Sequence, residues 1–527
     1  MLVSAGQLPT MIEDTASRPH RAAAAPALPA QPMAYRRLLL VVRTLLRVFF
    51  RRVEVLGREN VPGRGGGLIV AWHPNGLVDP ALILATCPRA VAVGARHGLF
   101  RWPLLGSLMR GLGTVPIYRR QDLAPGPAGG AAAAAPTANA ANAASLEALA
   151  QAMAEGRFVA LFPEGDSHDR PRPMALRTGA ARLYLRACEL TPPDAPPPVI
   201  VPVGLFYNDK EIFRSNAAVV YHPPLTLPEE AAYRAAVPEG EGRERVRRLT
   251  RHLETVLERV VYATDSWQEH HLLHRMRKAA TVERWLALGV AQPPPADAEE
   301  RLLGFARVWT AYRELRRRRP QETERLLRRL EEYDRALRAL GLDDDDLDRR
   351  PLASELAKLA RLLAQVVVVY LLLPSFFLLG LAVNLPAALA VGWIARRASA
   401  RRKDEASIKL LAGAVVFPLT WLALAALSAA GWLALHRVFP GIPDSPLPAA
   451  AAAFLVCALG GAVALRYERV ARETWRAVQV GITRRRRARA IARLRRERHA
   501  LYGAAMTLLA DFPLPERVDA ASWAGPL

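Results

Sequence analysis

Leu68-Ile-Val-Ala-Trp-His-Pro-Asn-Gly-Leu-Val-Asp79 decides how the first half of this chain folds. Residues 68–72 are apolar throughout, as in a buried strand, and a loop containing Pro and Gly follows them. His73 comes at the carboxyl end of this strand, and ligands bind at that edge of an open α/β sheet. The apolar run after Asp79 and Pro80 predicts a helix with Asp79 as its N-cap and Pro80 in its first position.

Short apolar runs recur between residues 53 and 225 and alternate with helical stretches. The strand candidates are Val53–Leu56, Leu68–Trp72, Ala90–Val93, Thr114–Tyr118, Phe158–Phe162, Val199–Phe206 and Ala218–Tyr221. This alternation predicts an α/β domain with a mainly parallel sheet. Pro202 restricts its own strand to an edge or an end of the sheet. A Pro/Gly/Ala-rich tract over residues 122–142 is predicted to be a surface insertion without chemistry.

His73 and Asp79 face each other across a short loop, and such a pair can activate an alcohol. The imidazole takes the hydroxyl proton, while the carboxylate holds the tautomer and stabilises the imidazolium. The pair alone is a weak signal, because a loop histidine beside a capping aspartate is common for structural reasons. The His73–Asp79 pair becomes a stronger indication if other strands place polar residues at the same edge of the sheet.

Two later strands also end in polar residues. The run Gly113-Thr-Val-Pro-Ile-Tyr-Arg119 ends in a guanidinium, the group best shaped for bidentate phosphate binding. The strand Phe158–Phe162 leads into Pro163-Glu-Gly-Asp-Ser-His-Asp169, where Gly165 allows close approach of the backbone to a ligand. Together with His73 and Asp79, these residues predict a site for a phosphate-bearing substrate.

The order of these blocks resembles the glycerolipid acyltransferase family. The blocks are His73…Asp79, Gly113…Arg119, Phe162-Pro-Glu-Gly165 and the apolar Val199–Gly204, and they cover residues of about 50–225. Five residues separate His73 from Asp79, where four are usual in the family. This longer form, with the Ser-His-Asp-Arg continuation after Gly165, is most similar to the fungal-type glycerol-3-phosphate/dihydroxyacetone-phosphate acyltransferases.

The resemblance implies a reaction and a role for each block. His73 would be the base and Asp79 its partner, while Pro202 would lie on the acyl-donor side. The substrate-binding residues it implies are Arg119, Glu164, Gly165, Ser167, His168 and Arg170. The expected enzyme is an O-acyltransferase that moves an acyl group from acyl-CoA or acyl carrier protein to glycerol-3-phosphate or dihydroxyacetone phosphate. It would need no metal or redox cofactor. 1-Acylglycerol-3-phosphate is the alternative acceptor.

Other functions are less favoured by the residues. Ser167-His168-Asp169 invites an esterase triad, but adjacent residues rarely reach triad geometry. His270 and His274 stand one helical turn apart, as zinc ligands can, but no HExxH pattern accompanies them. No role is predicted for Asp166, which replaces a small residue of the family pattern. A catalytically inactive membrane lipid-binding or scaffold protein is the alternative of a different class.

Charge and hydropathy divide the rest of the chain. The chain has 72 Lys and Arg and 49 Asp and Glu. The resulting net charge of +23 favours anionic partners. The predicted parts are a disordered leader (1–33), an amphipathic membrane-surface helix (34–52), the acyltransferase catalytic domain (53–225), a helical arm (226–350), a transmembrane region (351–466) and a basic cytoplasmic tail (467–527). Packing on the core is the alternative for the helix. For the tail, anionic membrane lipids are favoured over nucleic acid, which is not expected as a partner.

Three apolar runs predict the membrane part. Leu410–Leu435 and Pro448–Leu465 are each long enough to cross the roughly 30 Å of hydrocarbon in a bilayer. The run 362–395 is interrupted at Asn384-Leu-Pro386 and has arginines on both flanks, which predicts a re-entrant segment or tight hairpin with both ends in the cytoplasm. An Ala-, Arg- and Pro-rich composition is typical of GC-rich bacteria. We therefore expect an integral protein of a bacterial inner membrane with a cytoplasmic catalytic domain.

Overall fold

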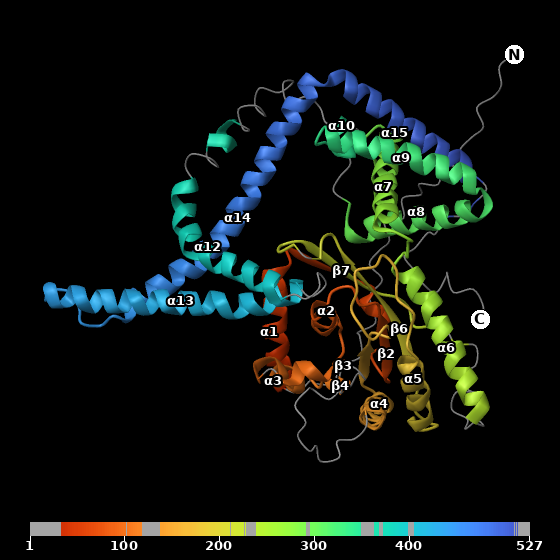
Figure 1. Cartoon of the computed structure of the whole chain (residues 1–527), viewed down its shortest axis with the longest axis horizontal. Helices are drawn as coiled ribbons and strands as arrows, with labels where there is room; N and C mark the ends of the chain where they lie inside the picture. Colours follow the sequence, from red (N-terminus) through yellow and green to blue (C-terminus); the bar gives the residue numbers. More distant parts are fainter. Residues whose placement is uncertain are drawn as a thin grey trace, which may run out of the picture.

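In a computed structural model the chain has an α/β domain, a helical arm and a group of long apolar helices (Figure 1). The residues that the structure describes are 33–101, 103–117, 138–210, 212–225, 227, 239–290, 296–348, 363–367, 373–398, 405–510, 512 and 514. The predicted leader lies outside them, as does most of the predicted insertion over residues 122–142.

A seven-stranded sheet is the centre of the α/β domain. Its strands are β1 (Arg52–Leu56), β2 (Gly67–Ala71), β3 (Val91–Arg96), β4 (Val115–Ile117), β5 (Phe158–Leu161), β6 (Val199–Tyr207) and β7 (Asn216–Tyr221), in the order β1-β7-β6-β2-β5-β3-β4. Neighbouring strands are parallel except β6 and β7. The predicted α/β fold with a mainly parallel sheet is confirmed, and each predicted strand is present.

Pro202 lies in an interior strand, so its predicted position at an edge or end of the sheet was wrong. Strand β6 pairs with β2 on one side, where Pro202 is opposite Val70, and with β7 on the other. The ladder with β7 covers only Val203–Tyr207. Because Pro202 precedes that ladder, its missing N–H removes no rung between β6 and β7.

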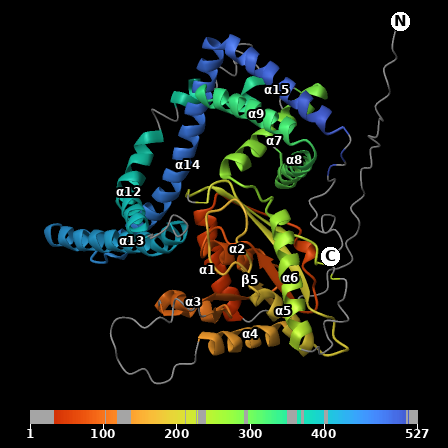
Figure 2. The ribbon, with the colours of Figure 1, turned by 45° about the vertical axis from the view of Figure 1, so that its right-hand side comes forward.

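Helices cover both faces of the sheet (Figures 1 and 2). On one side lie α1 (Met33–Phe49), α2 (Val78–Thr86) and α3 (Pro103–Gly111), and on the other α4 (Ala138–Ala154), α5 (Gly179–Leu190) and α6 (Glu239–Val260). The apolar face of α1 is buried in the core through Leu39, Val42 and Leu46. That face is therefore unavailable to lipid. Membrane contact by α1 stays a prediction and would use the opposite side, where Leu40 and Val48 are exposed.

The arm contains helices from both ends of the second half of the chain. They are α7 (Trp267–Ala287), α8 (Ala298–Arg318), α9 (Pro320–Ala339), α10 (Asp344–Asp348) and α15 (Ala488–Leu508), and the last of these packs on α7 and α9 (Figure 2). Arg498 of α15 is 1% exposed and pairs with Glu283 at 2.7 Å and Asp348 at 2.6 Å. The predicted basic tail is thus partly an integral element of the arm, and Arg498 is not available to lipid headgroups.

Arg275 is the centre of a second buried ion network in the arm. Its guanidinium lies 2.7 Å from Asp334, 2.5 Å from Asp343 and 2.7 Å from Asp344. Asp334 and Asp344 are fully buried, and Tyr333 donates a hydrogen bond to Asp344 at 2.6 Å. The acidic run of α10 therefore joins α7 to α9.

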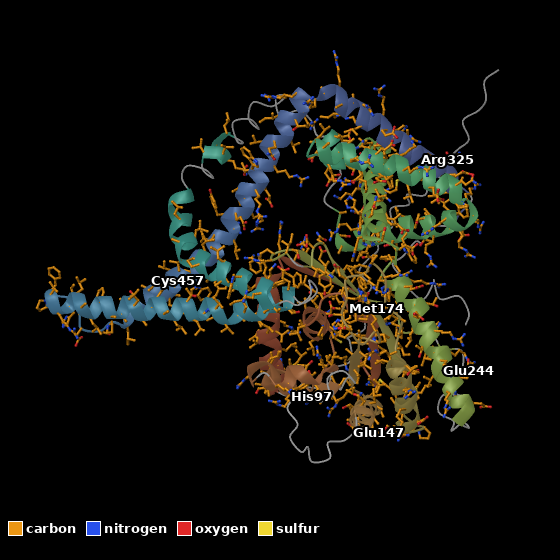
Figure 3. All side chains as sticks on the ribbon, viewed as in Figure 1. His97, Glu147, Met174, Glu244, Arg325 and Cys457 are labelled. Carbon is orange, nitrogen blue, oxygen red and sulfur yellow. The ribbon has the colours of Figure 1, made fainter. Side chains whose placement is uncertain are left out.

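Removing the cation should be costly. We expect Arg275→Met to lower the free energy of unfolding by about 3–5 kcal/mol, because it leaves the buried Asp344 carboxylate without its cation and takes one of the cations from Asp334 and Asp343. Thermal unfolding of the detergent-solubilised full chain would measure this. Arg325 lies on the outside of the arm (Figure 3). Arg325→Gln is a suitable control that should change stability by about 0.5 kcal/mol or less. Equal melting temperatures for Arg275→Met and the wild type would contradict the prediction.

Three long helices form the apolar part of the chain. They are α12 (Leu373–Ala398), α13 (Glu405–Val438) and α14 (Leu447–Arg486), and each packs on the other two. Among the described residues, α13 and α14 are long and apolar enough to cross a membrane. The predicted spans Leu410–Leu435 and Pro448–Leu465 lie within them. Cys457 lies in the region where the three helices cross (Figure 3).

The predicted hairpin over 362–395 was wrong for the described part of that run. Residues 373–398 form one helix that continues through Asn384 and Pro386. Asn384 donates hydrogen bonds to the carbonyls of Gly380 and Cys457 and accepts one from the Trp421 indole at 2.9 Å, so its amide joins all three helices. Neighbouring helices can satisfy the polar groups of a Pro-containing apolar helix in this way.

Candidate active site

His73 and Asp79 form a close pair despite their longer spacing. The Nδ1 atom of His73 lies 2.8 Å from a carboxylate oxygen of Asp79, which is fully buried, whereas the His73 side chain is 16% exposed. The Phe162 ring stacks on the imidazole with centroids 4.2 Å apart. Because a carboxylate only accepts, the proton of a neutral His73 lies on Nδ1. The Nε2 atom is then free to accept a proton from a substrate hydroxyl.

Asp79 is held by the loop and by a neighbouring strand. The backbone N–H of Asn75 donates to the same carboxylate oxygen at 2.7 Å, and the Tyr207 hydroxyl donates to the other. Burial and the charge of Asp79 raise the pKa of Tyr207 well above its usual value, so the phenol remains a donor. The predicted N-cap was wrong: α2 begins at Val78 and its N-cap is Leu77. Asp79 accepts from the loop and from Tyr207 instead of capping the helix.

Sheet topology explains why these groups meet. Strands β2, β5 and β6 are mutually parallel, so their carboxyl ends lie at one edge. His73 follows β2, Phe162 follows β5, and Tyr207 is the last residue of β6. The predicted edge is therefore the location of the pair. Tyr207 was not predicted, although its position at the end of a buried strand was a usable signal.

Glu164 and His168 form a second buried pair beside the first. The carboxylate of Glu164 lies 2.5 Å from Nε2 of His168, and both side chains are buried. Nδ1 of His168 accepts from the Arg170 backbone N–H, and the His168 N–H donates to the His73 carbonyl at 3.0 Å. Burial raises the pKa of Glu164, while the contact with His168 opposes that rise. The pair connects the two loops at the sheet edge, and its predicted contact with substrate stays a prediction.

The other predicted residues of this loop have distinct positions. Ser167 is buried, and its N–H donates to the Asp166 carboxylate at 2.9 Å, which gives Asp166 a local role. Arg170 is exposed. Arg119 lies outside the described residues. The predicted contacts of Ser167, Arg170 and Gly165 with the acceptor stay predictions.

Ser167, His168 and Asp169 do not form a triad. Asp169 pairs with Lys210 at 2.7 Å, whereas the imidazole of His168 contacts Glu164 and the Arg170 backbone. Lys210 also donates to the Pro74 carbonyl at 3.0 Å and so joins this loop to the His73 loop. The geometry gives no support to a serine-esterase mechanism.

Arg177 is a candidate site residue that the sequence analysis missed. Gly165 has φ +73°, and a Cβ there would lie 2.7 Å from Nε of Arg177, so the guanidinium packs directly over the glycine. The Arg177 N–H donates to the Pro163 carbonyl at 2.8 Å. Arg177 is exposed and forms no ion pair within the described part of the chain. An arginine two residues before α5, which begins at Gly179, was the available signal, because helix N-termini bind anions.

The His73 loop also contacts the apolar helices. The Leu77 N–H donates to the Ser407 hydroxyl at 3.0 Å, across 330 residues of sequence. Ala406 is 1% exposed and belongs to the core cluster of the α/β domain, and Leu410 packs against it. The start of α13 is therefore attached to the loop that carries His73 and Asp79.

Loss of the Ser407 hydroxyl should disturb that loop. We expect Ser407→Ala to reduce turnover by up to roughly tenfold, because an unpaired buried N–H costs about 1–3 kcal/mol. Ser407→Thr should restore most of the rate. Ser428 lies on the same helix as Ser407 but donates to the Ala449 carbonyl of α14, so Ser428→Ala is the matched control. Turnover of Ser407→Ala equal to that of the wild type would show that the contact does not position the loop.

Residues 52–205 match the family model described as Acyltransferase. They are an acyltransferase domain of the glycerolipid acyltransferase family. An uncharacterized acyltransferase of Schizosaccharomyces pombe is 23% identical over 270 residues, which cover 37% of this chain and 39% of the relative. Glycerol-3-phosphate O-acyltransferase 1 of Saccharomyces cerevisiae is 29% identical over 126 residues, or 24% of this chain and 16% of the relative.

Two bacterial proteins are also similar to parts of this chain. The 1-acyl-sn-glycerol-3-phosphate acyltransferase of Borreliella burgdorferi is 23% identical over 171 residues, covering 32% of this chain and 60% of the relative. A crystal structure of the 1-acyl-sn-glycerophosphate acyltransferase of Thermotoga maritima aligns with 42% of this chain and 80% of its own, at 17% identity and a TM-score of 0.28. The chain thus spans less than two thirds of the length of each of these sequence relatives.

Proposed function

We propose that this protein transfers a fatty acyl group from an acyl thioester to a hydroxyl of glycerol-3-phosphate or dihydroxyacetone phosphate. The observation that carries the proposal is the His73–Asp79 pair at the carboxyl edge of the sheet. His73 Nε2 takes the hydroxyl proton while the oxygen attacks the thioester carbonyl. The C–S bond then breaks, and the imidazolium returns the proton to the departing thiolate. Asp79 stabilises the imidazolium between these steps.

The acceptor's phosphate would bind beside this pair. Arg177 over Gly165 and the N-terminus of α5 offer a guanidinium and free backbone N–H groups, the usual ligands of a phosphate monoester. Arg119 and Arg170 stay in the proposal as further cations. 1-Acylglycerol-3-phosphate is the alternative acceptor. The Borreliella burgdorferi relative named for that acceptor supports it.

The donor is proposed to be acyl-CoA or acyl carrier protein, used as a co-substrate. The acyl group moves from the thiol sulfur to the hydroxyl oxygen, and the hydroxyl proton moves to the thiolate. The proposed reaction therefore requires no metal or redox cofactor. The remaining proposed partners are anionic membrane lipids. Nucleic acid is not among them.

A membrane location follows from the apolar helices. Two of them are long and apolar enough to cross a bilayer, and α13 begins at the catalytic loop, so an amphiphilic product would form close to lipid. Within this proposal the protein lies in a bacterial inner membrane with its acyltransferase domain in the cytoplasm. Arginine-rich segments beside the apolar helices support that orientation.

The full chain in lipid vesicles would test this function. Radiolabelled acyl-CoA or acyl carrier protein is offered with each of the three acceptors, beside a His73→Ala variant. We expect labelled product from glycerol-3-phosphate or dihydroxyacetone phosphate with the wild type alone. Faster acylation of 1-acylglycerol-3-phosphate would favour the alternative acceptor. No transfer to any acceptor would favour an inactive lipid-binding or scaffold protein.

A further inference from the structure

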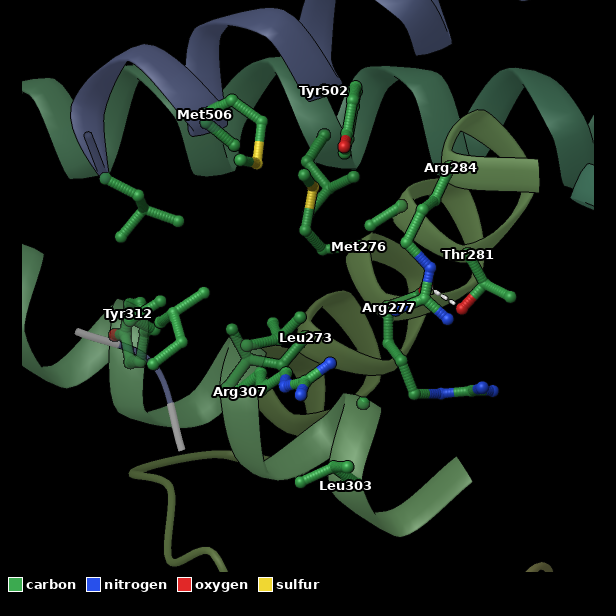
Figure 4. A pocket seen from close by; sticks show the side chains of 18 of the residues that line it. Leu273, Met276, Arg277, Thr281, Arg284, Leu303, Arg307, Tyr312, Tyr502 and Met506 are labelled. Atoms are coloured by element: carbon green, nitrogen blue, oxygen red, sulfur yellow. Dashed lines mark hydrogen bonds between the residues drawn. The ribbon is translucent and has the colours of Figure 1, made fainter. Parts of the chain in front are cut away.

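A cavity of about 590 Å³ lies in the helical arm, outside the acyltransferase domain (Figure 4). Its walls come from α7, α8, α9 and α15, and its volume falls within the roughly 300–1,000 Å³ of small-molecule sites. Much of the lining is aliphatic or sulfur-containing, including Leu273, Met276, Leu303, Leu327, Met506 and Leu509. Such a lining suits an acyl chain. Bulky polar molecules would lose their hydration there without compensation.

Arginines also line the cavity. They are Arg277, Arg284 and Arg307; in Figure 4 the first two lie on one side of the cavity and Arg307 lies beside Leu273. The Nε atom of Arg277 is buried without a hydrogen-bond partner, and its side chain packs against Gly304, where a Cβ would lie 3.3 Å from Cγ. Burial and the nearby charge of Arg301 lower the pKa of Arg277. Arg277 is thus a partly desolvated cation, which an anionic ligand would stabilise.

Three acidic residues line the cavity as well. Asp297 is the N-cap of α8 and accepts from the Glu300 N–H, while Glu300 pairs with Arg284 at 3.3 Å. Glu299 lies in the first turn of the same helix. Among the described residues, none of these carboxylates forms an ion pair with Arg277. Asp343, Asp344 and Asp345 act on Arg277 only through longer-range charge, without an ion pair among the described residues. The cavity therefore combines an apolar wall with a cation that no carboxylate contacts.

We propose that the arm cavity binds a single-chain anionic lipid, with its acyl chain against the apolar wall and its phosphate against Arg277. A phosphate monoester fits better than a carboxylate, because it carries more charge and has three acceptor oxygens to share among several guanidiniums. The ligand class is a lysophosphatidate from the surrounding leaflet. This inference rests on the arm alone and does not require the proposed acyl transfer.

Photolabelling of the full chain tests the site. A lysophosphatidate with a diazirine in its acyl chain is added to the protein in phosphatidylcholine nanodiscs, and labelled peptides are located by mass spectrometry. We expect labelled peptides from α7, α8, α9 or α15. Arg277→Gln should weaken the apparent affinity roughly tenfold or more, since it removes a charge-assisted hydrogen bond. Arg325→Gln, on the outside of the arm, should leave it unchanged.

Two further comparisons keep the proposal open to refutation. Ala280 lines the cavity, so Ala280→Phe should fill it and abolish arm labelling without removing a charge. Diazirine analogues of oleic acid and of lysophosphatidylcholine should label the arm poorly. Labelling confined to the acyltransferase domain, or arm labelling that neither Arg277→Gln nor Ala280→Phe reduces, would overturn the site. Equal labelling by the oleic acid analogue would overturn the phosphate assignment, and equal labelling by the lysophosphatidylcholine analogue would overturn the preference for a phosphate monoester. Acyl transfer by the wild type is measured separately, so failure of one proposal is distinct from failure of the other.

Discussion

Asp79→Asn is expected to lower the turnover number for acyl transfer by roughly 10²–10⁴-fold, the range that general-base catalysis contributes. The carboxylate accepts hydrogen bonds from His73, the Asn75 N–H and the Tyr207 hydroxyl. An amide in its place has only one oxygen, and its NH₂ group would face a donor. His73 would then be free to carry its proton on Nε2, the atom that must accept the substrate's proton.

Tyr207→Phe separates this effect from a general loosening of the loop. The Asp79 carboxylate would keep its bonds to His73 and to the Asn75 N–H, so we expect a loss of roughly tenfold or less, in line with one net hydrogen bond. Initial rates at saturating donor and acceptor measure both variants. If Asp79→Asn kept more than a tenth of the wild-type rate, His73 would not depend on Asp79, and the proposed base would need revision.

The close approach of His73 and Asp79 could be predicted because its signals are local. Leu68–Trp72 is apolar enough to be recognised as a buried strand, and His73 follows directly. Parallel strands bring their carboxyl ends to one edge, so Glu164 after β5 could also be expected nearby. Each predicted strand exists for the same reason: alternation of apolar runs and turns is a short-range property.

The site residues that the sequence analysis missed or misassigned make contacts with residues distant in the sequence. The Tyr207 and Lys210 contacts join β6 and the segment after it to the His73 loop, and the Ser407 contact spans 330 residues. The N-cap prediction for Asp79 failed because its carboxylate accepts from Tyr207, 128 residues away, and from the nearby Asn75 N–H instead of from helix N–H groups. The hydrophobic pattern of one segment does not reveal which distant residue will form a hydrogen bond with it.

The hairpin prediction failed in a similar way. Asn384 and Pro386 were treated as breaks, because in an isolated apolar helix they leave polar groups unsatisfied. In the folded protein the Asn384 amide bonds carbonyls of α12 and α14 and the Trp421 indole of α13. Gly380 and Gly460 also allow the backbones of α12 and α14 to approach closely, since a Cβ at Gly380 would lie 2.5 Å from the Gly460 carbonyl oxygen. The packing of α12 against α13 and α14 therefore allows α12 to continue through Asn384 and Pro386.

Arg177→Gln is expected to raise the KM for the phosphate-bearing acceptor by roughly 10- to 100-fold, the cost of losing a hydrogen bond between charged groups. The KM for the acyl thioester should stay unchanged, because Arg177 lies over Gly165 beside α5, where only the acceptor's phosphate is proposed to bind. Gly165→Ala should act in the same direction, since its Cβ would displace the guanidinium. Its φ of +73° also disfavours a side chain.

A matched control is available on the same helix. Arg182 is an exposed arginine within α5, so Arg182→Gln removes an equal charge and leaves the packing of Arg177 on Gly165 in place. Its KM for the acceptor should stay close to that of the wild type. Steady-state rates with each substrate varied in turn distinguish the outcomes. A raised thioester KM with an unchanged acceptor KM in Arg177→Gln would assign Arg177 to the donor, and the phosphate site would then have to be sought around Arg170 and Arg119.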